Sequence, residues 1–145
     1  MEDEIIDSFK FTVIDEDIAR IGAIALEIRN RIKKLVKRPE DLRRLGVCLF
    51  ETEANLSIHS VGGSIEITVS RSKIAVSARD EGPGIPDIQK ALTPGYSTAP
   101  PWARELGFGS GMGLKNIKRL ADTFSIVSSE KGTSLTFEIK TDENK

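Results

Sequence analysis

Apolar residues in the early part of the chain recur with the period of an α-helix. Between Asp15 and Lys37 they stand three or four positions apart, so that one side of a helix would carry Ile18, Ile21, Ala25, Ile28, Ile32 and Leu35. Asp15 is a suitable N-cap residue, and the basic run at 29–38 suits the C-terminal end of a helix dipole. The pattern therefore predicts a helix that follows Asp15 and continues to about Lys37.

A second helix is predicted over residues 39–60. It would begin at Pro39, because proline is well tolerated in the first turn of a helix. One face carries Leu42, Leu45, Leu49 and Leu56, whereas Val47, Phe50 and Ile58 lie well away from that face. A helix that is apolar on nearly all sides is buried on more than one side, so the polar residues inside it need partners.

Alternation of apolar and polar residues predicts strands in the rest of the chain. Every second residue is apolar in 64–70 and again in 73–80, and the short connection between them indicates a hairpin. A further helix is predicted at 112–122. The remaining strands are expected at 9–14, 124–129 and 134–140. This order is typical of an α/β (α+β) two-layer sandwich, with helices on one face of a mixed, largely antiparallel sheet.

Length and composition predict one globular domain, residues 1–145, with a polar tail at 141–145. The net charge of −1 gives no general attraction to nucleic acid or to a membrane surface. No run of about 18 apolar residues predicts a spanning helix, and no secretory signal is visible at the N-terminus. The single cysteine excludes an intrachain disulfide, so a cytoplasmic protein is expected.

Four glycines alternate with other residues at Gly107, Gly109, Gly111 and Gly113, just before the helix predicted at 112–122. Their spacing matches neither the dinucleotide fingerprint nor the P-loop. Glycines that open a helix still suit an anion, because free N–H groups and the helix dipole favour negative charge there. Taken alone, the cluster leaves two alternatives: a phosphate or nucleotide site, and a plain flexible loop.

Three polar residues on the second predicted helix, Glu51, Asn55 and His59, are spaced four positions apart and so lie along one side. Carboxylate and amide oxygens are suitable ligands for Mg²⁺, and a carboxylate one turn away could accept a proton from a hydroxyl or water. The alternative is that all three side chains simply face solvent.

A third group of residues is DEGPG at 80–84, directly after a predicted strand. The alternation places Asp80 on the core side, where its carboxylate needs hydrogen-bond donors such as the amino group of adenine. Gly82 and Gly84 leave room for a flat ring beside the backbone. The alternative is an ordinary turn with an aspartate cap.

Four motifs follow one another along the chain: ExxxN on a helix, DxGxG after a strand, GxGxGL before a helix, and a late GT. They occupy 51–55, 80–84, 109–114 and 132–133. In order and spacing, from about residue 42 to 140, they resemble the GHKL ATPase superfamily, which includes histidine kinases, gyrase B and Hsp90. The chain is most similar to the small bacterial partner-switching serine kinases of the RsbW, SpoIIAB and RsbT type, and GMGLKNIKRLAD resembles the RsbT branch in particular.

The resemblance implies a Bergerat-type ATP-binding fold and a role for each matching residue. Asn55 would coordinate Mg²⁺, Glu51 would be the catalytic base, and Asp80 would hydrogen-bond the adenine amino group. Thr133 would help hold adenine through water. The glycines of the two glycine motifs would meet adenine or the phosphates: Gly82, Gly84, Gly109, Gly111 and Gly113.

Residues 93–108 would then form a lid over ATP, from which Arg104 would contact the γ-phosphate. Trp102, in this lid, has no counterpart in the family pattern, and either a contact with a partner or packing of the lid explains it equally well. His59 matches a histidine that follows the asparagine in many family members.

The resemblance implies an ATP-dependent serine/threonine kinase whose substrate is a STAS-type anti-sigma-factor antagonist or scaffold protein. The alternative is an anti-sigma factor or activator in which ATP mainly sets the conformation. A sigma factor or a downstream phosphatase are further partners that the resemblance suggests. The first strand and helix would either form a homodimer surface or pack only on the chain's own sheet.

Overall fold

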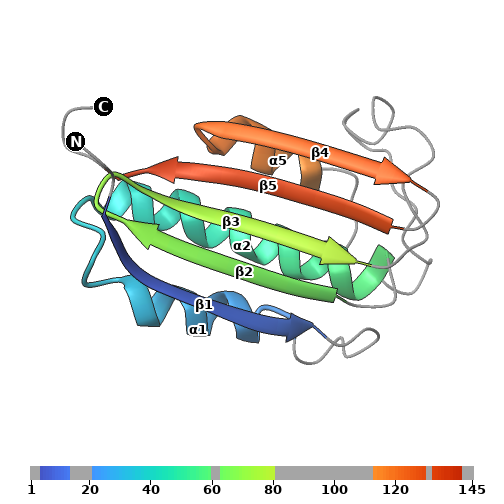
Figure 1. Cartoon of the computed structure of the whole chain (residues 1–145), viewed down its shortest axis with the longest axis horizontal. Coiled ribbons are helices and arrows are strands. Elements are labelled where there is room, and N and C mark those ends of the chain that lie inside the picture. The colour runs from blue at the N-terminus through green and yellow to red at the C-terminus, as the bar shows by residue number, and fades with distance from the viewer. Residues whose placement is uncertain (1–3, 14–20, 60–62, 81–112, 130–131, 142–145) are drawn as a thin grey trace.

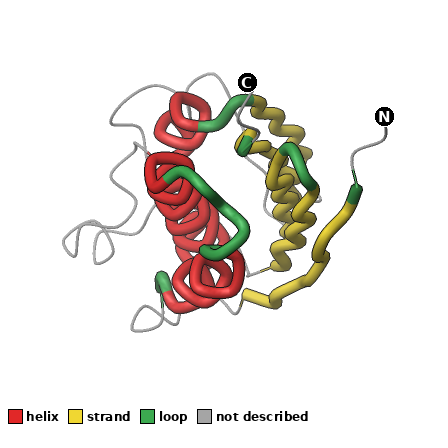
Figure 2. Tube along the Cα trace, turned by 90° about the vertical axis from the view of Figure 1, so that its left-hand side faces the viewer, coloured by secondary structure: helices red, strands yellow, loops and turns green. Residues whose placement is uncertain are grey.

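The computed structural model describes residues 4–13, 21–59, 63–80, 113–129 and 132–141. Their helices form one layer and their strands form the other (Figures 1 and 2). In chain order, the elements are β1 (Ile5–Val13), α1 (Ala23–Ile32), α2 (Pro39–His59), β2 (Gly63–Ser70), β3 (Lys73–Asp80), α5 (Gly113–Leu120), β4 (Thr123–Ser129) and β5 (Gly132–Lys140). The predicted two-layer arrangement is confirmed.

The described strands form one sheet in the order β1-β2-β3-β5-β4, and every pairing in it is antiparallel. β1 starts at Ile5 rather than at residue 9, because it pairs with β2 as far as Ile5 opposite Ser70. β5 lies between β3 and β4, with Arg79 opposite Ser134. The C-terminal end of β3 is therefore beside the start of β5.

The core of the described part lies between the sheet and helices α1, α2 and α5. Alternate residues of the central strands are almost completely buried: Ile65, Ile67, Val69, Ile74, Val76, Ala78, Leu135, Phe137 and Ile139. From the helices, the buried residues include Ile28, Ile32, Leu45, Leu49, Leu56 and Ile117. Burying each such aliphatic side chain stabilises the fold by about 1.5–3 kcal/mol. None of the helices in the described part of the chain is both long and apolar enough to cross a membrane.

α1 is shorter than its apolar pattern predicts. It begins at Ala23, after Gly22 with a φ of 100°, and it ends at Ile32 rather than near Lys37. The Leu35 N–H bonds to the Ile32 carbonyl in a turn instead of continuing the α-helix. The proposed N-cap, Asp15, belongs to residues 14–20, outside the described part of the chain.

A side chain of α2 explains where α1 begins. The Glu53 carboxylate accepts hydrogen bonds from the backbone N–H of Ala25 at 2.8 Å and of Ile24 at 3.4 Å. The first N–H groups of a helix have no partner within the helix, and a negative charge is favourable beside them. Glu53, only 2% exposed, therefore supplies the cap from another element, which an analysis of neighbouring residues could not detect.

We expect Glu53→Ala to lower the free energy of unfolding by about 1–3 kcal/mol, because it leaves buried N–H groups without an acceptor. Chemical denaturation measures this change. Glu66→Ala is the matched control, since the Glu66 side chain is 60% exposed and its Oε1 atom lies 4.0 Å from Lys10 Nζ in a surface ion pair. The control should change stability by less than about 0.5 kcal/mol. Equal effects of the two substitutions would contradict the capping role.

Candidate active site

The described members of the predicted site lie on α2, at the start of α5, at the end of β3 and near the start of β5. The C-terminal end of α2, the end of β3 and the start of β5 are directed toward the same end of the molecule (Figure 1). Helical spacing puts Glu51 and Asn55 on one side of α2, and both side chains are partly exposed, whereas Thr52, Glu53 and Ala54 between them are buried. The backbone of His59 completes α2, but its side chain is outside the described part.

Glu51 lies directly against the first residue of α5. A Cβ atom added to Gly113 would be only 2.6 Å from Glu51 Oε2 and 3.8 Å from Glu51 Cδ. Real Cβ atoms essentially never approach so closely, so the carboxylate occupies the place that a larger residue would need. Glycine at this position therefore allows the carboxylate of α2 to reach the N-terminal end of α5.

Burial raises the pKa of Glu51 above its ordinary value of 4.5. The charged form is disfavoured when a carboxylate loses water, and a higher pKa makes the carboxylate a stronger proton acceptor. The N-terminal end of α5 acts in the opposite direction, because a helix dipole favours negative charge there. Glu51 is thus an acidic residue with a perturbed pKa at a helix start, an arrangement that suits a general base.

Asp80 and Thr133 form a second group, on the sheet. The Thr133 N–H donates a hydrogen bond to Asp80 Oδ1 at 3.1 Å, and the hydroxyl oxygens of Thr133 and Ser128 are 2.9 Å apart. Thr133 is only 6% exposed. Gly132 has a φ of 141°, a conformation that side chains rarely adopt, and it leads the chain into β5 at this point.

This second group combines acceptors and hydroxyls at the edge of the core. A carboxylate accepts several hydrogen bonds at once, so the bond from Thr133 is compatible with a further donor such as an amino group. The buried positions of β3 alternate at Ile74, Val76 and Ala78, so Asp80 continues the core-facing series, as the sequence predicts. The structure thus brings together two of the predicted adenine residues, which are 53 positions apart in the chain.

The remaining predicted site residues lie outside the described part of the chain. They belong to residues 81–112, which include the expected lid at 93–108. They are Gly82, Gly84, Trp102, Arg104, Gly109 and Gly111.

Two residues that contact the elements of the site were not identified from the sequence. Ser128 contacts Thr133 across the β4–β5 hairpin, and no motif marks it. Arg44 binds the Leu120 carbonyl at the C-terminal end of α5. A signal for Arg44 did exist, because it precedes Glu51 by seven positions and therefore lies on the same face of α2.

Comparison with known proteins identifies the same family as the motifs in the sequence. Residues 40–143 match the family described as histidine kinase-, DNA gyrase B-, and HSP90-like ATPase. The serine/threonine-protein kinase RsbT of Bacillus subtilis is 36% identical over 104 residues, which cover 69% of this chain and 72% of that protein. An anti-sigma F factor of Bacillus licheniformis is 30% identical over 137 residues, 88% of this chain and 87% of the relative.

Among solved structures, the RsbU and RsbW domains of Rv1364c from Mycobacterium tuberculosis superpose with a TM-score of 0.61 at 14% identity. The alignment covers 92% of this chain and 32% of that longer one. At 14% identity, this structural similarity establishes the fold alone.

We expect Gly113→Ala to displace the Glu51 carboxylate while the protein stays folded, because among the described residues the new methyl group meets only the far end of the flexible Glu51 side chain. The ¹³C resonance of the Glu51 carboxyl group should shift, and the melting temperature should change by less than about 4 °C, equivalent to about 1 kcal/mol.

Gly46→Ala is the control, since its Cβ would lie 3.7 Å from Arg29 Cδ, an ordinary contact. This variant should leave the Glu51 resonance unchanged and gain about 0.5–1 kcal/mol in stability, as alanine is favoured in a helix interior. An unchanged Glu51 resonance in Gly113→Ala would show that the carboxylate does not lie against α5 in solution.

Proposed function

The chain belongs to the family of histidine kinase-, DNA gyrase B-, and HSP90-like ATPases, and from this premise we propose that it is an ATP-dependent protein serine/threonine kinase of a bacterial partner-switching module. Its substrate would be a serine or threonine of a STAS-type antagonist or scaffold protein. The observation that carries the proposal is the contact of the Glu51 carboxylate with Gly113. It puts a proton acceptor beside a helix start, where phosphates bind favourably.

In the proposed mechanism, Asp80 accepts a hydrogen bond from the adenine amino group and Thr133 helps to hold the base. The N-terminal end of α5, which begins at Gly113, would hold the phosphates, because free N–H groups and the helix dipole favour negative charge there. Glu51 takes the proton of the substrate hydroxyl, and the hydroxyl oxygen of the substrate forms a bond to the γ-phosphorus. The bond between the γ-phosphorus and the bridging oxygen breaks, and ADP leaves with that electron pair.

Mg²⁺ fits the donors that are present. The amide oxygen of Asn55 and the carboxylate of Glu51 are hard oxygen ligands, one helical turn apart on α2. We assign Asn55 as the ligand of the ion and Glu51 as the base. When bound, Mg²⁺ neutralises charge on the phosphates and orients them.

The resemblance to the family extends this proposal to residues outside the described part of the chain. Gly82 and Gly84 would lie beside adenine, and Gly109 and Gly111 would meet the phosphates. Arg104, in a lid at 93–108 of a single domain, would contact the γ-phosphate.

The second candidate is an anti-sigma factor or an activator of another enzyme, in which ATP mainly selects a conformation. It is favoured by the relatives named anti-sigma F factor, one of which aligns with 88% of this chain. A protein that only binds its partner has no need for a base, so the presence of Glu51 favours the kinase. Both functions imply a cytoplasmic protein with an antagonist as partner, and a sigma factor, a phosphatase or a second copy of the chain are further proposed partners.

Asn55→Ala should weaken Mg²⁺-dependent ATP binding at least about tenfold, because one ligand to the ion is lost. Calorimetry with and without Mg²⁺ measures this change. Asn30→Ala is the control, since Asn30 is an exposed asparagine on α1, and it should bind ATP as the unmodified protein does. No binding of ATP by the unmodified protein would refute the proposed function, and unchanged binding by Asn55→Ala would refute the metal role.

Glu51→Gln should still bind ATP but should lose about 10²–10⁴-fold in the rate of phosphoryl transfer to a STAS-domain protein. Only the carboxylate can accept the proton, so the rate of the unmodified enzyme should fall as the pH drops through the raised pKa of Glu51. That decline should begin at a higher pH than the ordinary value of 4.5 implies, and Glu51→Gln should lack it. Glu66→Gln, at an exposed position, is the control. Full transfer by Glu51→Gln would mean that another group is the base.

A further inference from the structure

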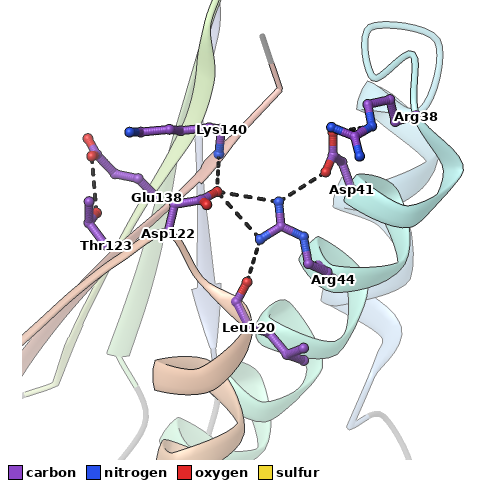
Figure 3. A network of polar contacts seen from close by, with 8 residues as sticks. All are labelled: Arg38, Asp41, Arg44, Leu120, Asp122, Thr123, Glu138 and Lys140. Atoms are coloured by element: carbon purple, nitrogen blue, oxygen red, sulfur yellow. Dashed lines mark hydrogen bonds and ion pairs between the residues drawn. The ribbon is translucent and has the colours of Figure 1, made fainter. Parts of the chain in front are cut away.

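A charged cluster joins α2 to the C-terminal end of α5, at the opposite end of α5 from Gly113 (Figure 3). Arg44 Nη1 donates a hydrogen bond to the Leu120 carbonyl at 2.6 Å. Arg44 Nη2 donates to Asp41 Oδ1 at 3.0 Å and to Asp122 Oδ2 at 3.3 Å. The same Asp122 oxygen accepts a hydrogen bond from the backbone N–H of Lys140 at 2.7 Å, which extends the cluster to β5.

Asp41 and Arg44 are more strongly shielded from water than the members of an ordinary surface ion pair, whereas Asp122 lies at the exposed edge of the cluster. The side chains of Asp41, Arg44 and Asp122 are 2%, 15% and 28% exposed. Burial by itself would lower the pKa of Arg44, but the hydrogen bonds and charges of Asp41 and Asp122 outweigh it and raise that pKa. The guanidinium is therefore held in one place by three partners: Asp41 on its own helix, Leu120 at the end of α5, and Asp122 in the connection between α5 and β4.

Arg44 also satisfies a group that α5 cannot satisfy itself. The last carbonyls of a helix have no partner within the helix, and a positive charge is favourable at this end of the dipole. α5 has only eight residues, and only Leu114 and Ile117 in it are buried. A helix of two turns is marginal on its own, so its position depends on contacts with the rest of the protein.

The spacing of residues on α2 matches the length of α5. Glu51 follows Arg44 by seven positions, and Leu120 follows Gly113 by seven positions. At about 1.5 Å per residue, both pairs span about 10 Å along their helix axes. α2 therefore contacts one end of α5 through Glu51 and the other end through Arg44, and the two helices run antiparallel.

We propose that Arg44 is a positioning residue, which holds the N-terminal end of α5 against Glu51 in the orientation that accepts the phosphates of the nucleotide. This role rests on the proposed function, although Arg44 itself touches neither the nucleotide nor the phosphorylated hydroxyl. The Leu120 carbonyl and Asp122 transmit its effect, because they are continuous with α5 and with the start of β4.

The test compares Arg44→Met with Arg31→Met. Arg31 forms an ion pair with Asp7 at 3.1 Å, on the β1 side of the molecule, and is the matched control. Two quantities are measured at a temperature at which each variant is fully folded. They are the amide resonance of Gly113 in the nucleotide-free protein and the affinity for ATP with Mg²⁺.

Arg44→Met should shift the Gly113 resonance and weaken ATP binding about tenfold, since small displacements of positioning groups have large effects. Arg31→Met should change neither. Arg44→Lys keeps the charge without the two-armed geometry, so it should restore only part of the affinity. A lower melting temperature with unchanged Gly113 resonance and unchanged affinity would overturn the proposal and leave Arg44 a purely structural role.

If Arg44→Met does not fold, Asp122→Asn serves instead. This variant removes the charge but keeps an oxygen for the Lys140 N–H, and it should change both quantities in the same direction by a smaller amount. Unchanged values in Asp122→Asn would overturn the proposal. If the unmodified protein binds no ATP, the proposed function fails, and the Gly113 resonance alone decides whether Arg44 positions α5.

Discussion

Helix α2 lies between α1 and α5 and contacts the N-terminal end of each, and the rest of the structure depends on this constraint. Glu53 accepts the first N–H groups of α1, and Glu51 lies against Gly113 at the start of α5. Helix starts carry partial positive charge and unpaired donors, so a glutamate is favourable at both places. These two contacts place a carboxylate at the start of each short neighbour, and under the proposed function Glu51 forms one wall of the phosphate site.

The two glutamates are two positions apart and face different helices, which gives one residue type two different tasks. Glu53 is almost fully buried and its carboxylate is occupied by backbone N–H groups, so it stabilises the fold. Glu51 is partly exposed and lies where a glycine leaves space, so it remains available for proton transfer under the proposed function. Residues two apart on a helix point about 200° apart, and a central helix therefore serves both neighbours.

The candidate site combines parts of both layers. The sheet supplies Asp80 and Thr133, which the antiparallel β3–β5 pairing brings side by side. The helices supply Glu51 and Asn55 together with the start of α5. Buried residues such as Leu49, Ile117 and Leu135 form the core between these parts, so the position of the helix side relative to the sheet side is set by close packing. The group proposed to bind the base, on the sheet, and the group proposed to bind the phosphates, at a helix end, are thus held on one rigid core.

The sequence by itself determined the strands of both hairpins, the start of α2 at Pro39, and the spacing that puts Glu51 and Asn55 on one side of that helix. Each of these depends on residues within a few positions of one another, through alternation, helical period or a proline. Alternation also predicted that Asp80 faces the core side. How those side chains act on a nucleotide stays a prediction.

Only the tertiary structure decided where α1 begins, which residue holds the C-terminal end of α5, and that Ser128 joins Thr133. The bond from Ala25 to Glu53 spans 28 positions, and the bond from Arg44 to Leu120 spans 76. No local signal in the sequence reveals such distant partners. Burial of the core brings them to the helix ends, where a charged group out of water interacts more strongly than one in solvent.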